Sequence, residues 1–508
     1  MQLFRTKSVE QTIAETGEEG RKLKRNRTRW QLPTKGVAVA VGAGIVSVGA
    51  QAAAFHAGPA VIISFLIAGI VCGAAVMCYA EFASMIPVAG SAYTFTYTTV
   101  GEIMAWIIGW DLILEMLMAG SVISKYWGVY LNDFMRLMGW NANTNLTFGS
   151  FHIDIAPIII VAFFTTLLVF GTKIGARVDG AMTVLKIAIV FFVVIVGFFY
   201  VKASNFTPFI PPSQPASTVE GSSAVTGVMT QPLWQFATGM TPSVYGVPGI
   251  LSGAALVFFA FIGFDVVATA SEETKNPHKN VPLGIGVGML LIIVMYMLVA
   301  VVTTGMVSYA DLAKQDSPSL ATAFELVGAD WAAKIISFGI VLGLATVVMV
   351  LLLGLTRIVF AMSRDGLLPR GLSKTGKHGT PAALQIVVGA VVALVAAFFD
   401  IGVLSDMVNI GTLSAFTLVA ISIPIMRKKR PDLPRAFKMP GSPWIPILIA
   451  VANFWLMLNL SVLTWIRFVV WLVVGFAIYF GYGYWHARLG KGDLTETLSA
   501  ETDKAVNG

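Results

Sequence analysis

Long apolar segments separated by short polar ones run through almost the whole chain. A helix needs about 20 predominantly apolar residues to span a bilayer. Segments of this kind lie at 34–55, 58–82, 98–130, 154–171, 180–201, 249–270, 281–307, 333–361, 382–400, 403–426, 443–461 and 464–485. The pattern predicts an all-α polytopic membrane protein with twelve transmembrane helices. Because the number is even, we expect both termini on the same side of the membrane.

The composition is typical of a membrane protein, and the distribution of basic residues predicts its orientation in the membrane. Of the 508 residues, 56% are hydrophobic and 12% are charged, whereas soluble proteins carry about 25% charged residues. Twenty-seven of the 34 lysines and arginines fall in 1–35, 172–180, 271–282, 357–381, 427–441 and 486–508. All of these segments are cytoplasmic if the N-terminus is inside, as the positive-inside rule requires. We therefore expect a plasma-membrane protein with both termini in the cytoplasm, in contact with lipid and not with nucleic acid.

The segments divide the chain into seven regions. We expect a basic cytoplasmic N-terminal segment (1–33), a first group of five helices (34–201), an extracellular loop rich in Pro, Ser, Thr and Gly (202–248) and a second group of five helices (249–426), each group a candidate repeat of the other. A cytoplasmic loop (427–442), helices 11 and 12 (443–485) and a cytoplasmic tail (486–508) follow.

Glycines interrupt two of the apolar segments. The first contains AVGAGIVSVGA (40–50), with Gly42 and Gly44 one residue apart, and the sixth contains VFFAFIGFDVVATASEE (257–273), with Gly263 near its middle. Glycine in a helix costs about 1 kcal/mol relative to alanine. Irregular backbone at membrane depth is tolerated only where it is buried in protein or lines a cavity. The glycines therefore predict a broken helix in each of these segments.

A broken helix offers polar backbone groups to a ligand. The exposed N–H groups attract a carboxylate, and the exposed carbonyl groups attract an ammonium group or a small cation. If helices 1–5 recur as helices 6–10 in inverted topology, the first and sixth segments correspond and their breaks face each other near the midplane. This arrangement predicts a binding site for a zwitterion. The alternative is that the glycines only permit close packing of helices.

Ionisable residues within apolar segments are the second group of candidates. Lys186 lies about two turns into the fifth segment. Burial disfavours the charged form of a lysine, which makes Lys186 a candidate for proton coupling; the alternative is a fixed cation that binds the carbonyls of a neighbouring half-helix. Asp111 and Glu115 share one helix face. Their functional interpretation is a counter-charge for a basic substrate or a proton site, and their structural one is an acid satisfied by a neighbouring helix end.

Motifs for other chemistries are absent from the sequence. The five histidines do not have metal-ligand spacing, and the chain contains no GxxxxGK[ST], GxSxG or HExxH. We therefore predict no metal, no cofactor and no enzymatic activity.

Several longer stretches resemble one known family. They are AGPAVIISFLIAGI (57–70), CYAEFASMIPVAGSAYTFTY (78–97), GEIMAWIIGWDLILE (101–115), LVFFAFIGFDVVATASEETKNP (256–277), RIVFAMSRDGLLP (357–369) and RPDLPRAFKMPG (430–441). In these stretches the chain resembles the cationic amino acid transporters of the amino acid–polyamine–organocation superfamily. The resemblance implies the leucine-transporter-type inverted repeat of helices 1–5 and 6–10, followed by two extra helices.

The resemblance also implies roles for individual residues. The substrate carboxylate would bind N–H groups around Ala43 and Gly44, and the α-ammonium would bind carbonyls of Ala40, Phe259, Ala260 and Ile262. Lys186 matches the fifth-helix lysine that occupies the place of a sodium ion in sodium-coupled relatives, which implies proton coupling. The full predicted substrate site is Ala40, Gly42, Ala43, Gly44, Ile45, Phe259, Ala260, Ile262 and Gly263, with Glu115 and Asp111 as candidates for side-chain specificity.

The opening of the first segment departs from the family pattern. GVAVAVGAGIV (36–46) stands where the family has a stretch close to GVGAIIGTGIF. Ala43 lacks the usual hydroxyl, and Val46 is smaller than the usual phenylalanine, so the pocket is expected to be wider and the substrate spectrum is left open.

These observations predict a secondary transporter that imports L-amino acids by proton symport, with alternating access around two broken helices. An amino acid or polyamine exchanger without net proton flux is the alternative, and a sensor that binds without transporting is a third. The expected partners are the amino acid, protons and membrane lipid. Side-chain specificity, stoichiometry and any small regulatory membrane subunit are left open by the sequence.

Overall fold

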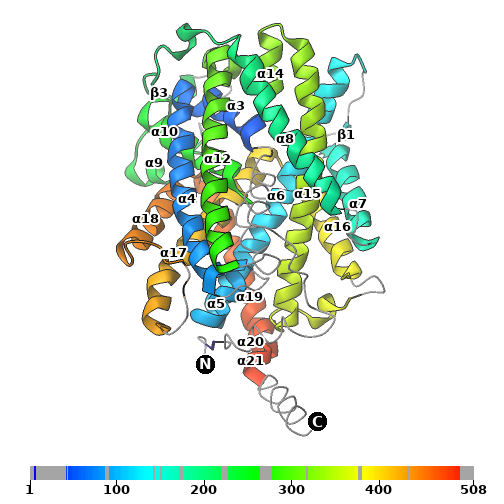
Figure 1. The fold of residues 1–508 in the computed structure, drawn as a ribbon, viewed down its shortest axis with the longest axis vertical. Coiled ribbons are helices and arrows are strands. Elements are labelled where there is room, and N and C mark those ends of the chain that lie inside the picture. Colours follow the sequence, from blue (N-terminus) through cyan, green and yellow to red (C-terminus); the bar gives the residue numbers. More distant parts are fainter. Residues whose placement is uncertain are drawn as a thin grey trace.

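The computed structural model describes one bundle of helices (Figure 1). The described residues are 5–6, 42, 44–85, 91–140, 144–148, 151–170, 175–218, 227–263, 277–315, 318–375, 380–431, 435 and 437–491. Six helical stretches in this part of the chain are long and apolar enough to cross a membrane by length and composition, and five shorter apolar helices accompany them. The prediction of a helical, polytopic chain is confirmed at this level.

Helix occurs in each of the predicted apolar segments. The first segment holds η1 (Gly44–Val48), α3 (Gly49–Ala52) and η2 (Ala53–Ala57), and the sixth holds α10 (Gly246–Val257) and η7 (Phe258–Phe261). The others hold α4 (Val61–Met85), α6 (Glu102–Leu137), α7 (Ile155–Phe170), α8 (Gly175–Phe198), α12 (Pro277–Met306), α15 (Asp330–Arg364), α16 (Ala382–Phe398), α17 (Ile401–Lys429), α18 (Trp444–Leu458) and α19 (Val462–Ile478), which continues into η10 (Tyr479–Gly483) and α20 (Tyr484–His486).

The predicted boundaries of the third segment, 98–130, are wrong at both ends. A separate helix, α5 (Ser91–Thr99), ends before α6 begins. Gly101, at the N-cap of α6, has a φ of 134°, which a helix cannot contain. At the other end α6 continues to Leu137, past the apolar segment.

Short elements connect the long helices. Strands β1 (Asn145–Phe148) and β2 (Phe151–Asp154) form an antiparallel hairpin, and β3 (Gln214–Pro215) pairs with β4 (Ser243–Val244), so the fold is not strictly all-α. The loop predicted at 202–248 also contains α9 (Leu233–Thr238). Two further helices, α13 (Tyr309–Ala313) and α14 (Leu320–Leu326), lie between α12 and α15. The remaining short elements are η3 (Gly58–Ala60), η4 (Ala203–Phe206), η5 (Ala216–Thr218), η9 (Arg370–Ser373) and α21 (Arg488–Lys491).

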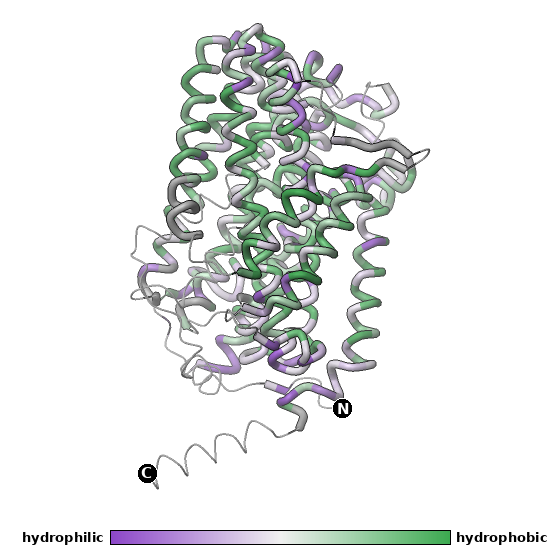
Figure 2. Tube along the Cα trace, turned by 90° about the vertical axis from the view of Figure 1, so that its right-hand side faces the viewer, coloured by the Kyte–Doolittle hydropathy of each residue, from purple (hydrophilic) through white to green (hydrophobic). Residues whose placement is uncertain are grey.

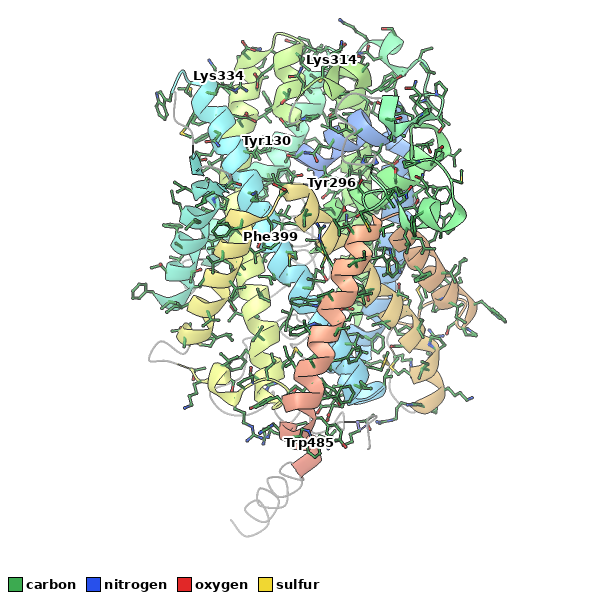
Figure 3. All side chains as sticks on the ribbon, turned by 180° about the vertical axis from the view of Figure 1, so that it is seen from behind. Tyr130, Tyr296, Lys314, Lys334, Phe399 and Trp485 are labelled. Atoms are coloured by element: carbon green, nitrogen blue, oxygen red, sulfur yellow. The ribbon has the colours of Figure 1, made fainter. Side chains whose placement is uncertain are left out.

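Polarity separates the middle of the bundle from its ends. Hydrophobic residues dominate the long helices, and hydrophilic residues gather toward both ends (Figure 2). Lys314 and Lys334 lie at one end and Trp485 at the other (Figure 3). Arg5 reaches this second end of the bundle, because its guanidinium donates to the carbonyl of Tyr484 over 3.5 Å. The first and last described parts of the chain therefore meet at the same end of the bundle.

Long helices pack in pairs whose members are five apolar segments apart. The second segment packs on the seventh (α4 on α12), the third on the eighth (α6 on α15) and the fourth on the ninth (α7 on α16). The first also contacts the sixth, through α3 and η2 against α10. Helix α6 also packs on α17, so it contacts more than one of the long helices.

Tryptophans join α6 to α19. Trp110 donates to the carbonyl of Trp471 (2.9 Å), and Trp471 donates in return to the carbonyl of Trp110 (3.3 Å). Their rings stack with centroids 4.4 Å apart. One turn along, Trp106 donates to the carbonyl of Gly475 (3.1 Å). A Cβ added at Gly475 would lie 2.5 Å from the Trp110 ring, so the stack requires glycine there.

We expect Gly475→Ala to destabilise the bundle by about 1–3 kcal/mol, the usual cost of overpacking. The matched control is Gly481→Ala in the same helical stretch, because an added Cβ at Gly481 meets nothing within 4 Å. Thermal unfolding of the purified proteins in detergent measures the difference. Equal melting temperatures of the two variants would show that the stack does not hold α19 in place.

Candidate functional site

The described part of the first apolar segment consists of Gly42 and the residues from Gly44 onward. Gly42 is buried and lies in a bend, and the segment Gly44–Val48 is a π-helix whose residues are all buried. A π-helix misaligns backbone carbonyls and is common at functional sites. The Tyr130 hydroxyl, from α6, donates to the carbonyl of Val46 (2.8 Å), and the Ser47 hydroxyl donates to Tyr130 (3.4 Å). A side chain from the third segment thus binds the irregular backbone of the first.

The sixth segment is interrupted at Ile262. Helix α10 tightens into the 3-10 turn Phe258–Phe261, after which Ile262 is extended (ψ 148°). Gly263 follows with a φ of 87°, a left-handed conformation that favours glycine. The Tyr296 hydroxyl, from α12, donates to the carbonyl of Ala260 (2.7 Å). Here too, a tyrosine from another helix donates a hydrogen bond to a backbone carbonyl.

The first interruption (the π-helix Gly44–Val48) touches the second (the 3-10 turn Phe258–Phe261 and the extended Ile262). A Cβ added at Gly44 would overlap the Cα of Ala260 and would lie 2.5 Å from its Cβ and 2.9 Å from its nitrogen. These atoms belong to the backbone or are fixed to it, so they cannot rotate away. The backbone of the first segment therefore runs directly against the 3-10 turn of the sixth, and only glycine fits at position 44.

Beyond this crossing, α10 presents a small-residue face to the first segment. Gly249 and Gly253 are spaced four residues apart, as in helix pairs whose backbones approach closely. An added Cβ at Gly249 would overlap the carbonyl oxygen of His56, and one at Gly253 would lie 2.9 Å from the hydroxyl of Ser64. The same His56 carbonyl accepts a hydrogen bond from the N–H of Tyr245 (2.7 Å). The outer parts of the two broken helices therefore form one closely packed unit.

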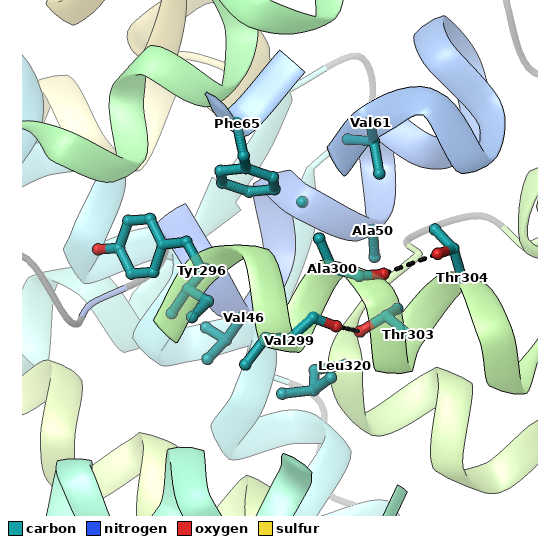
Figure 4. Close-up of a pocket in the computed structure, with 12 residues that line it drawn as sticks. Val46, Ala50, Val61, Phe65, Tyr296, Val299, Ala300, Thr303, Thr304 and Leu320 are labelled. Atoms are coloured by element: carbon teal, nitrogen blue, oxygen red, sulfur yellow. Dashed lines mark hydrogen bonds between the residues drawn. The ribbon is translucent and has the colours of Figure 1, made fainter. Parts of the chain in front are cut away.

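A small cavity lies beside the first interruption (Figure 4). Its lining comes from the first segment, α4, α12 and α14, and comprises Ile45, Val46, Gly49, Ala50, Val61, Phe65, Tyr296, Val299, Ala300, Thr303, Thr304 and Leu320. The two threonines donate to carbonyls of their own helix, at Val299 and Ala300. The cavity is therefore predominantly apolar. Val46, the small residue at a position where the family pattern has phenylalanine, is part of its wall.

Lys186 is buried on α8, against a glycine face of α15. Its side chain is 6% exposed. An added Cβ at Gly343 would lie 3.1 Å from Lys186 Cγ, and one at Gly339 would overlap the side chain of Ile189. Two glycines four residues apart thus let α15 receive the Lys186 stem and the neighbouring isoleucine. Packing therefore fixes the direction of the lysine stem.

The two acids on α6 face α17. Asp111 and Glu115 are both fully buried, and Asp111 accepts a hydrogen bond from the Ser414 hydroxyl (2.8 Å). An added Cβ at Gly411 would lie 3.6 Å from the Asp111 carbonyl and 3.7 Å from the Glu115 nitrogen. The Ser414 bond joins two packed helices and favours the structural interpretation of Asp111.

Carboxylates also tie helices together at the end of the bundle near Arg5. Glu81 binds Arg427 through both oxygens (2.9 and 2.7 Å) and accepts from the N–H of Met439. Glu102 accepts hydrogen bonds from Tyr97 (3.1 Å) and Tyr479 (2.9 Å). Burial, and then the neighbouring Glu102, raise the pKa of Tyr97, which keeps its hydroxyl protonated as a donor.

The structure brings most of the predicted site residues to one place. Gly44 contacts Ala260, and the π-helix that holds Gly44 and Ile45 contacts the 3-10 turn that holds Phe259 and Ala260. In sequence, Ile262 and Gly263 follow that turn, and Gly42 lies two residues before Gly44. Ala40 and Ala43 lie outside the described residues, as does Asp265. Tyr130 and Tyr296 were not predicted from the sequence. A hydroxyl inside an apolar segment is the signal that marks them, since such a group needs a partner within the bilayer.

We expect Gly44→Ala to reduce substrate uptake by about fivefold or more, since relieving an overlap with fixed backbone atoms costs about 1–3 kcal/mol. Gly120→Ala is the matched control, because its Cβ would meet Val392 at an ordinary 3.5 Å. Uptake into proteoliposomes, normalised to folded protein by size-exclusion chromatography, gives the comparison. Wild-type uptake by the Gly44 variant would mean that the two interruptions need not touch.

Comparison with known proteins identifies the family. A family model described as amino acid permease matches residues 32–482. The Bacillus subtilis branched-chain amino acid permease BcaP is 41% identical over 497 residues, which cover 96% of this chain and 99% of the relative. The methylthioribose transporter of Bacillus subtilis is 38% identical with the same two coverages. The vacuolar cationic amino acid transporter 2 of Arabidopsis thaliana is 35% identical over 85% of this chain and 64% of its own length.

These matches confirm the resemblance seen in the sequence. They extend over nearly the whole bundle and include both interrupted helices. Members of this family are transport proteins of the membrane and not enzymes. The chain belongs to the amino acid permease family, within the amino acid–polyamine–organocation superfamily, and is a multi-pass membrane transporter.

Proposed function

We propose that this permease imports L-amino acids across the plasma membrane by alternating access around its two interrupted helices, in symport with protons. The observation that carries the proposal is the direct contact between Gly44 and Ala260. The contact supports the proposal, because we take N–H groups from Gly44 onward and carbonyls of the Phe258–Phe261 turn to bind the substrate together. A zwitterion fits such a pair, since its carboxylate binds the first set and its ammonium the second.

The pairing of helices supports an inverted repeat of helices 1–5 and 6–10 within twelve transmembrane helices. In such a repeat, each helix of the first half has a counterpart five segments later. Four of these counterpart pairs pack directly: the first with the sixth, α4 with α12, α6 with α15 and α7 with α16. The basic segments then place both termini in the cytoplasm.

An aliphatic amino acid is the proposed substrate. Apart from Ser47, Tyr130 and Tyr296, several described side chains at the two interruptions are apolar, among them Ile45, Val46, Phe259 and Ile262. A relative that is 41% identical over almost its whole length is named a branched-chain amino acid permease. A basic substrate would need a counter-charge. Glu115 is the candidate for that role, while Asp111 is already engaged by Ser414.

Alternating access requires contacts that differ between the outward-open and inward-open states. The first segment and α10 form one unit through Gly249 and Gly253. Tyr130 reaches this unit from α6, which packs mainly on α15 and α17. We propose that the unit moves against α6 and that the Tyr130–Val46 bond closes the end of the site nearer Lys314. Lys186, on a different helix pair, is the proposed proton-coupling residue.

Uptake into proteoliposomes of labelled leucine, alanine, lysine and methylthioribose, with and without an inward proton gradient, tests the proposal. Gradient-stimulated uptake of leucine supports both the substrate class and the symport. Uptake only into vesicles preloaded with amino acid would instead identify an exchanger. Saturable binding without uptake would identify a sensor. Methylthioribose belongs in the panel because a 38% identical relative is named for it.

Lys186→Met should abolish the stimulation by a proton gradient while leaving binding of the amino acid measurable. Methionine has a similar length and fits against Gly343, but it has no proton to exchange. Uptake at several external pH values, compared with the wild type, measures the effect. A variant whose uptake keeps the full pH response would return Lys186 to the role of a fixed cation.

A further inference from the structure

Tyr296 makes a specific contact with the interruption of the sixth segment. It lies on α12 and is fully buried, and its hydroxyl donates to the carbonyl of Ala260 over 2.7 Å. Ala260 is inside the 3-10 turn that precedes the extended Ile262. It is also the residue whose backbone meets Gly44. The hydroxyl therefore acts on the carbonyl nearest the crossing of the two broken helices.

Aromatic packing holds the Tyr296 ring in one orientation. The ring centroid lies 5.1 Å from that of Phe261 and 5.8 Å from that of Phe65, with interplanar angles of 54° and 66°. All three side chains are at most 1% exposed. Edge-to-face contacts of this kind stabilise each other by about 0.5–1.5 kcal/mol per pair. Because the neighbouring rings confine it, the Tyr296 ring holds its hydroxyl beside the Ala260 carbonyl.

The bond also affects what this carbonyl can bind. A carbonyl oxygen has two lone pairs, so it accepts the Tyr296 hydroxyl and can accept a second donor. The hydrogen bond that closes the 3-10 turn, from Ile262 N–H to the Phe259 carbonyl, is long, at 3.3 Å. Without the hydroxyl, the carbonyls of the turn would be free to reorient when a cationic group leaves or enters.

We propose that Tyr296 is a positioning residue for the ammonium group of the substrate: it orients the sixth-segment carbonyls, at Ala260 and its neighbours, to which that group binds. The inference rests on the proposed function, because it assumes a substrate with an α-ammonium group at this crossing. It adds a residue from α12, outside the two broken helices, to the residues that determine recognition.

The test compares wild type with Tyr296→Phe, which keeps the aromatic packing and removes the hydroxyl. Competition against labelled leucine is measured with unlabelled leucine and with its α-hydroxy acid analogue, in which a hydroxyl replaces the ammonium. A preference for leucine over the analogue that falls about three- to tenfold in the variant, as the loss of one hydrogen bond predicts, supports the inference. The KM for leucine should rise while the maximal rate changes little.

Tyr245→Phe is the matched control. Its hydroxyl also donates to a carbonyl of a broken helix, that of Ala54, over the same 2.7 Å. Ala54 lies ten residues beyond Gly44, about 15 Å along a helix. This variant should keep the wild-type preference for leucine.

Three results would overturn the inference. If Tyr296→Phe lowered the affinity for leucine and for its analogue equally, the role of Tyr296 would be purely structural. If Tyr245→Phe lowered the preference for leucine as much as Tyr296→Phe does, the effect would not be specific to the crossing of the two segments. Wild-type protein that binds no amino acid would overturn the proposed function itself. If Tyr296→Phe does not fold, 3,5-difluorotyrosine at position 296 keeps the size and changes the donor strength; an unchanged preference for leucine would then contradict the inference.

Discussion

The structure depends on one constraint: backbone polar groups inside a bilayer must find partners within the protein. Continuous helices satisfy it by themselves, but the two interrupted segments do not. Here the cost of interruption is offset by phenolic hydroxyls from neighbouring helices, Tyr130 on the Val46 carbonyl and Tyr296 on that of Ala260. Both tyrosines are fully buried. Other helices thus supply donors to these two carbonyls, which links the proposed binding site to the packing of the bundle.

Glycine determines where helices cross. Gly44 meets Ala260, the Gly249 and Gly253 pair receives the first segment, and the Gly339 and Gly343 pair receives α8. At each crossing an added methyl group would overlap or crowd a neighbour. Without a hydrophobic driving force between helices, close packing is what holds them together in lipid. The packing interpretation of the glycines and the binding-site interpretation are therefore not rivals at Gly44, since the close approach is what brings the two sets of backbone groups together.

The positions of the helices could be predicted from the sequence, because the thickness of the bilayer fixes the length of each apolar segment. The interruption at Gly263 could also be predicted, since a glycine near the middle of such a segment weakens the helix at that point. The start of α6 could not, because it depends on the φ of Gly101 and on the separate helix α5. The hydrogen bonds of the two tyrosines could not be predicted from the sequence either. Tyr130 and Val46 are 84 residues apart, and no local pattern connects them.

Recognition by backbone groups explains how one fold serves relatives named for different substrates. Branched-chain and cationic amino acids share the same α-carboxylate and α-ammonium groups, so in the proposed binding mode the interrupted helices would bind both without a change of side chain. Methylthioribose, for which another relative is named, has hydroxyl groups that can donate to the same carbonyls. Selectivity must then come from the side chains that surround the crossing and from how tightly the orientation of the backbone carbonyls is fixed. A carbonyl held by a rigid tyrosine favours a donor in one direction, whereas a looser one accepts several. If the proposal holds, Val46 would act through the width of the cavity and Tyr296 through the direction of the Ala260 carbonyl, and these are positions at which substrate selectivity could change.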